Sequence, residues 1–114
     1  MEEIRPIILT NEETNEKYEL TFTRESVKFA EFRGFNIEDV DAHPMTRIPE
    51  LFYFAFRAKH KNISREKTDK ILFDELKGMP EGMLNRLVEL YTAPFRAFSQ
   101  TEEDAKNSHM TVEF

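Results

Sequence analysis

The sequence has no cysteine and only three glycines among its 114 residues. Without cysteine the chain can form no disulfide bond, no thiolate zinc site and no thiol nucleophile. Three glycines are too few to expect a glycine-rich loop that cradles phosphates. The densest apolar run, Leu51–Phe56, is far shorter than the roughly 20 residues that cross a bilayer. These absences argue against redox, nucleotide-binding and membrane-spanning classes of protein.

An excess of positive charge is also missing, because the formal net charge is −6. Affinity for nucleic acid comes mainly from lysine and arginine, so we predict no nucleic-acid partner. Because the apolar runs are short, we predict no membrane partner either. The first residues, Met1–Ile4, lack the basic segment and the long apolar run of a signal peptide. We therefore expect the protein in the cytoplasm.

One stretch, residues 57–70, departs from this acidic balance. Its basic side chains are Arg57, Lys59, His60, Lys61, Arg65, Lys67 and Lys70. Such a run is typical of a solvated helix end and turn. The alternative is a surface that meets an acidic partner.

Two segments near the N-terminus have the pattern of β-strands, and a polar, turn-like segment, 11–16, separates them. The apolar strand residues are Ile4, Ile7, Ile8 and Leu9 in the first segment and Tyr18, Leu20 and Phe22 in the second. A lone hairpin is marginal in water. We therefore expect it to pack on helices or to pair with the edge of another chain.

After Thr23 the apolar spacing changes to that of helices. The pattern predicts helices over about 24–33, 47–61 and 65–77, with Thr23, Thr46 and Ser64 as their N-caps. In the first of these helices, Phe32 is among the side chains expected to face inward. It also predicts a short turn at 37–40, capped by Asn36, and a loop over 41–45. The last helix carries inward apolar residues as far as Phe95 and Phe98, and Pro94 should break it at Ala93.

The whole pattern predicts an α+β fold with an N-terminal antiparallel β-hairpin followed by a bundle of four to five α-helices. We assign residues 1–100 to a single domain and residues 101–114 to a polar, flexible tail. The last segment, Met110–Phe114, alternates apolar and polar side chains. It is expected either to be disordered or to add a strand to an exposed sheet edge.

The central helix carries the candidate binding residues. Its apolar face comprises Ile48, Leu51, Phe52, Ala55 and Phe56, and its narrow polar stripe comprises Glu50, Arg57 and Lys61. Tyr53 and Phe54 border that stripe, so we expect their rings to be the least covered by the core. The predicted protein-binding residues are therefore Tyr53, Phe54, Arg57 and Lys61, with Phe29 and Phe73 as lesser candidates.

No constellation of catalytic or metal-binding residues emerges from the sequence. The histidines, His43, His60 and His109, lie in different segments. No two of them are three or four residues apart, so none can share a metal ion with another on one face of a helix. Neighbouring acids such as Asp74 and Glu75 point in different directions on a helix. We predict a protein that is not an enzyme, with no catalytic residue, no cofactor and no metal.

The order of these segments resembles the tail assembly chaperones of long-tailed phages and prophages. Four segments carry the resemblance, which extends over about residues 4–98: Tyr18-Glu19-Leu20-Thr21-Phe22-Thr23, Arg33-Gly34-Phe35, Ile48-Pro49-Glu50-Leu51-Phe52-Tyr53-Phe54-Ala55-Phe56 and Ile63-Ser64-Arg65-Glu66-Lys67-Thr68. It implies a small cytoplasmic α+β protein that binds and solubilises the tape measure protein and helps to recruit the tail tube protein. It implies no catalytic residue.

Two other readings stay open at this point. One is a different small phage structural component, such as a tail completion protein. The other is an enzyme whose site the sequence does not reveal. The unpaired edges of the hairpin and the rings beside the polar stripe further suggest a homo-oligomer or an exposed apolar groove.

Overall fold

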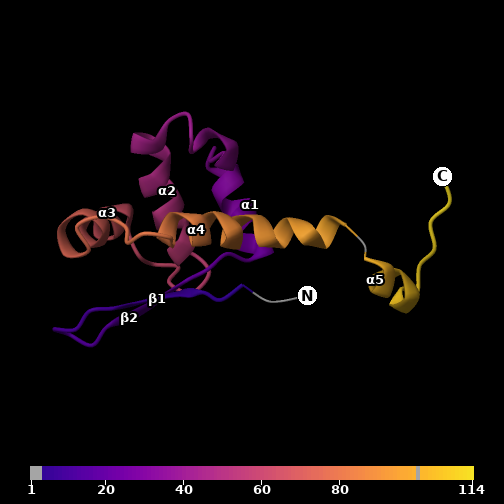
Figure 1. The fold of residues 1–114 in the computed structure, drawn as a ribbon, viewed down its shortest axis with the longest axis horizontal. Helices are drawn as coiled ribbons and strands as arrows, with labels where there is room; N and C mark the ends of the chain where they lie inside the picture. The colour runs from indigo at the N-terminus through magenta and orange to yellow at the C-terminus, as the bar shows by residue number, and fades with distance from the viewer. Residues whose placement is uncertain (1–3, 100) are drawn as a thin grey trace.

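A computed structural model describes residues 4–99 and 101–114, and it places the hairpin first and the helices after it (Figure 1). The elements in chain order are β1 (Ile7–Thr10), β2 (Lys17–Leu20), α1 (Arg24–Phe32), the 3₁₀ turn η1 (Ile37–Asp39), α2 (Pro44–Phe56), α3 (Arg65–Lys70), the π-helical turn η2 (Ile71–Glu75), α4 (Met83–Thr92), the 3₁₀ segment η3 (Ala93–Phe98) and α5 (Glu102–Asn107). The predicted α+β fold, with an antiparallel hairpin followed by helices, is confirmed.

The hairpin pairs β1 with β2 in antiparallel register, with Leu9 opposite Tyr18. The Asn11 side chain holds the turn, since its Oδ1 accepts hydrogen bonds from the amides of Glu13 at 3.0 Å and Thr14 at 3.3 Å. Just after β2 the chain meets α2: the Thr21 amide donates to the Ala55 carbonyl at 3.0 Å. The hairpin is therefore anchored on the helices.

Helix α1 begins where the sequence predicts. The Thr23 and Ser26 side chains form a capping box, in which Thr23 Oγ1 accepts from the Ser26 amide at 3.1 Å. The expectation that Phe32 faces inward is wrong, because its side chain is 90% exposed. Val27 and Ala30 set the buried face of α1, and the helical period carries Phe32 to the opposite side.

We expect Thr23→Ala to lower the free energy of unfolding by about 1 kcal/mol, because the Ser26 amide loses its acceptor at the start of α1. Chemical denaturation followed by circular dichroism measures the change. Thr111→Ala is the control, since Thr111 is exposed and makes no hydrogen bond in the described part of the chain. Equal losses in the two variants would contradict the capping role.

Helix α2 starts and ends earlier than predicted. It begins at Pro44, so the predicted loop over 41–45 is confirmed only as far as residue 43, and the Thr46 cap is wrong. Proline has a backbone angle suited to the first helical position and lacks the amide hydrogen that would be unpaired there. The helix ends at Phe56, not Lys61, because the chain then turns so that His60 can meet β2: the Glu19 amide donates to His60 Nε2 at 3.0 Å.

The second half of the chain follows the predicted caps and breaks. Ser64 caps α3, and the helical path continues through η2 to Glu75, short of the predicted residue 77. The break that Pro94 predicts at Ala93 is confirmed, because α4 ends at Thr92 and η3 begins at Ala93. Phe95 and Phe98 are exposed, contrary to prediction, because a 3₁₀ segment places residues three apart on the same side.

One buried cluster holds the fold together, with α2 at its centre. It comprises Leu20, Phe22, Val27, Ala30, Phe35, Val40, Leu51, Phe52, Phe54, Ala55, Phe56, Ile71, Leu72, Met83, Leu87, Leu90 and Tyr91. Aromatic rings meet edge to face across it, for example Phe22 with Tyr91 at 5.0 Å between centroids. The predicted inner face of α2 is thus confirmed at Leu51, Phe52, Ala55 and Phe56.

After η3 the chain extends away from the rest of the fold (Figure 1). Residues 102–107 form the short helix α5, which the sequence did not predict and which Thr101 caps. Every residue from 101 to 114 is exposed. Among the helices of the described residues, none has the length and the apolar character that crossing a membrane requires.

Candidate protein-binding surfaces

The structure separates the aromatic pair that the sequence proposed as a binding surface. Phe54 is only 5% exposed, so the expectation that its ring lies open is wrong. Its ring packs against Phe29 at 6.1 Å and Phe35 at 5.5 Å between centroids, and these two rings close the side of α2 that the helical pattern left open. Tyr53 is partly buried beside Phe54.

The two predicted basic residues do lie together. Arg57 Nη1 donates to the Lys61 carbonyl at 3.1 Å, and both residues line a hollow that also includes the exposed ring of Phe32. The Arg57 guanidinium sits 4.0 Å from the centre of the Phe29 ring, a cation–π contact. Arg57 therefore supports the local structure, and Tyr53 does not line this hollow.

Much of the basic stretch 57–70 has partners within the chain. Lys59 Nζ lies 3.8 Å from Glu19, and Arg65 Nε lies 2.8 Å from Asp69. His60 accepts a hydrogen bond from β2 through its Nε2. These contacts are what a helix end and turn need, which favours the solvated reading of this stretch.

An apolar groove of about 480 Å³ opens between the start of α2, η2 and the start of α4. We call it the apolar groove; it is lined by Pro44, Met45, Ile48, Pro49, Leu72, Phe73, Gly78, Met79, Pro80, Glu81, Gly82, Leu84 and Asn85. Met45 is 91% exposed and Phe73 is 57% exposed at its rim. Glu81 is the charged residue in this lining. The groove therefore presents apolar side chains to solvent.

The apolar groove depends on the connection between η2 and α4. The Gly78 amide donates to the Leu72 carbonyl at 2.9 Å, and Gly78 and Gly82 have φ angles of +106° and +87°, which side chains other than glycine rarely adopt. The sequence missed this surface apart from Phe73. Met45 beside Pro44, in a segment predicted as a loop, was the signal that could have found it.

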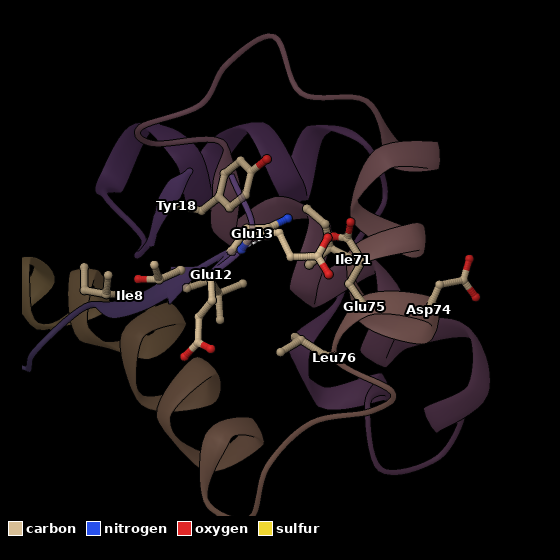
Figure 2. Close-up of a pocket in the computed structure, with 11 residues that line it drawn as sticks. Ile8, Glu12, Glu13, Tyr18, Ile71, Asp74, Glu75 and Leu76 are labelled. Atoms are coloured by element: carbon tan, nitrogen blue, oxygen red, sulfur yellow. Dashed lines mark hydrogen bonds between the residues drawn. The ribbon is translucent and has the colours of Figure 1, made fainter. Parts of the chain in front are cut away.

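A second groove, of about 660 Å³, runs beside β1 and the hairpin turn, and η2 forms its other wall (Figure 2). We call it the acidic groove; its lining is Ile8, Leu9, Thr10, Asn11, Glu12, Glu13, Tyr18, Ile71, Asp74, Glu75 and Leu76. Figure 2 shows Glu13 and Glu75 reaching from opposite walls and Asp74 turned outward. The lining combines apolar side chains with carboxylates.

The carboxylates of the acidic groove are not neutralised within the described residues. The ion pairs among the described residues, 4–99 and 101–114, include none of its four acidic side chains, Glu12, Glu13, Asp74 and Glu75. Burial raises the pKa of Tyr18, as do its hydrogen bond to Glu16 and the charges of Glu16 and Glu75. The Tyr18 hydroxyl donates to Glu16 at 3.0 Å. The groove thus carries a negative field.

The edge of β1 beside this groove is open. The Asn11 amide donates to the Glu16 carbonyl, so Asn11 faces β2. Amides along a strand point alternately toward and away from the partner strand, so the Leu9 amide also faces β2, opposite Tyr18. The amides of Ile8 and Thr10 therefore point outward, away from β2. In the described part of the chain no acceptor reaches those two amides. On the opposite edge, by contrast, His60 and Ala55 accept from the amides of Glu19 and Thr21.

Outside the two grooves, Arg47 is the centre of a structural network of charged side chains. Arg47 lies 2.7 Å from Asp39 and 2.6 Å from Glu50, and it joins η1 to α2. Hydrogen bonds from Arg47 and then from His43 hold the pKa of Asp39 below its usual value. Across residues 4–99 and 101–114, no group of three or more His, Asp or Glu side chains is arranged to hold a metal ion.

Comparison with known proteins gives one family. The family described as a domain of unknown function, DUF5055, matches residues 2–114, nearly the whole chain. No curated protein and no solved structure shows a significant match. The family description names no activity, so a functional conclusion has to come from the surfaces described above.

Proposed function

We propose that this chain, which belongs to the DUF5055 family, is a non-catalytic tail assembly chaperone that binds helical segments of a tape measure protein in the cytoplasm. The observation that carries the proposal is the apolar groove. Its lining gathers the exposed side chains of Met45 and Phe73 with further apolar residues in one hollow, and a contiguous apolar surface of this kind is typical of a protein-binding site.

The chemistry of the apolar groove suits an amphipathic helix. Such a helix lays apolar side chains at i, i+3, i+4 and i+7 into a groove of this kind, without needing directional hydrogen bonds. Met45 and Met79 are flexible, so the lining can repack around helices of different sequence. A chaperone that covers many stretches of one long helical partner needs this tolerance.

The resemblance to tail assembly chaperones supports the identity of the partner. That resemblance covers about residues 4–98, the region that contains the whole lining of the apolar groove. Recruitment of the tail tube protein, the second implied partner, is part of the same proposal. A tail completion protein is the competing structural role, and it would not require a groove open to varied helices.

Co-expression with the tape measure protein from the same phage or prophage tests the proposal. We expect that protein to be found in the soluble fraction only when this chain is present, and to co-purify with it. Solubility depends here on covering apolar helical surface, so the effect should survive moderate salt. A tape measure protein that is equally soluble without this chain, with no complex recovered, would overturn the proposal in favour of the generic structural role.

A further inference from the structure

The acidic groove marks a second binding surface on a different part of the fold from the apolar groove. We propose that it binds an extended, basic segment of another protein, which adds to β1 as a third strand. No residue lines both grooves. The two proposals can therefore fail independently of each other.

The open edge of β1 supplies the backbone part of this interaction. The outward amides of Ile8 and Thr10, with their carbonyls, repeat at the spacing that an incoming strand needs for a ladder of hydrogen bonds. The β2 side cannot serve in the same way, because the amides of Glu19 and Thr21 already donate to α2 and to the turn after it. The strand can therefore add on one side of the hairpin.

The walls of the groove supply side-chain contacts for that strand. Alternate side chains of an added strand point to opposite faces. On one face they would meet Leu9 of β1 and Ile71 and Leu76 of the opposite wall. The volume of about 660 Å³ has room for several such side chains. Apolar residues at alternate positions are therefore expected in the bound segment.

Charge complementarity sets the sign of the charged residues in the bound segment. Glu12, Glu13 and Glu75 border the groove without ion pairs, so lysine or arginine in the bound segment would neutralise them. The segment 110–114 of a second copy has the right alternation of apolar residues but carries Glu113, which these carboxylates would repel. The geometry thus favours a basic segment of a different protein.

Short synthetic peptides test the proposal directly on the full chain. One peptide alternates lysine with valine and phenylalanine, a second replaces each lysine with glutamate, and a third has the sequence of residues 108–114. We expect the basic peptide to bind about tenfold more tightly than either of the others by fluorescence anisotropy, and to weaken as salt rises. Equal binding of the 108–114 peptide would overturn the proposal in favour of a second copy of this chain.

Amide hydrogen exchange by NMR identifies strand addition. Exchange at Ile8 and Thr10 should slow by about tenfold when the basic peptide is bound, whereas the Leu9 amide, already bonded to β2, should change little.

Thr10→Pro removes one outward amide and no bond of the existing ladder, so the hairpin should survive while binding is lost. Unchanged binding by this variant would show that no strand is added.

Charge reversal tests the acidic rim. Glu13→Lys with Glu75→Lys should weaken the basic peptide by about tenfold or more. Glu31→Lys with Glu89→Lys is the matched control, because it makes the same change in net charge at exposed positions outside the groove. Equal weakening by both double variants would mean that overall charge attracts the peptide, and the proposed site would be wrong.

Discussion

A Phe56→Ala variant is expected to lose about 3–5 kcal/mol of unfolding free energy, because a large ring is removed from the centre of the core. Phe56 is fully buried on α2, and its ring meets Phe52 at 5.1 Å and Tyr18 at 5.5 Å between centroids. Removing the ring would leave a cavity where α2 contacts the hairpin. Since small domains have roughly 5–15 kcal/mol of stability, much of the total would be lost.

Phe32→Ala is the matched control for this prediction, because it deletes the same side chain from an exposed position of α1. We expect its unfolding free energy to stay within about 0.5 kcal/mol of the parent chain. Urea denaturation followed by circular dichroism measures both variants. A similar loss in the two, or a stable Phe56→Ala variant, would contradict the central position of α2 in the core.

Those features of the fold that depend on local chemistry could be predicted from the sequence. Thr23 and Ser64 are predictable N-caps because a hydroxyl before a helical pattern has one main structural use. The break at Pro94 is predictable because proline removes a helical hydrogen bond. The start of α2 was missed because Pro44 fits equally well after a loop or at the first position of a helix.

The candidate sites were harder to predict because exposure depends on packing between distant segments. Phe54 borders the polar stripe of α2, yet the rings of Phe29 and Phe35 come from other parts of the chain to cover it. Periodicity within one helix cannot show such a contact. The apolar groove likewise joins the start of α2 to η2 and α4, so its lining is not contiguous in the sequence.

The acidic groove could not be predicted from the sequence either. In the sequence, Asp74 and Glu75 are only a neighbouring acidic pair, and such a pair by itself indicates no role. The fold brings Glu75 across from Glu13, which precedes it by more than half of the length of the chain. The signal for an open strand edge was present in the hairpin pattern, but the sequence could not tell which of the two edges the helices would cover.

Placing two charges in the apolar groove is expected to abolish the proposed chaperone activity without unfolding the protein. In the Met45→Glu, Phe73→Glu double variant, a helix that enters the groove would have to bury two carboxylates beside its apolar face, which is costly without a partner charge. We expect at least about a tenfold loss of affinity for a tape measure segment. Both positions are largely solvent-exposed, so the thermal midpoint should change little.

The control for this prediction is Phe32→Glu with Met110→Glu, which adds the same charge at exposed apolar residues outside the apolar groove. Soluble tape measure protein recovered on co-expression, together with the fraction that co-purifies, measures both double variants. The control should keep the partner soluble, because its groove is intact. If both variants solubilise the partner equally well, the helix binds elsewhere on the surface, and the apolar groove is not the site of chaperone action. If both lose the activity equally, the loss comes from what the two variants share, which is fewer exposed apolar side chains and two added negative charges, and the apolar groove is not the specific site of the partner.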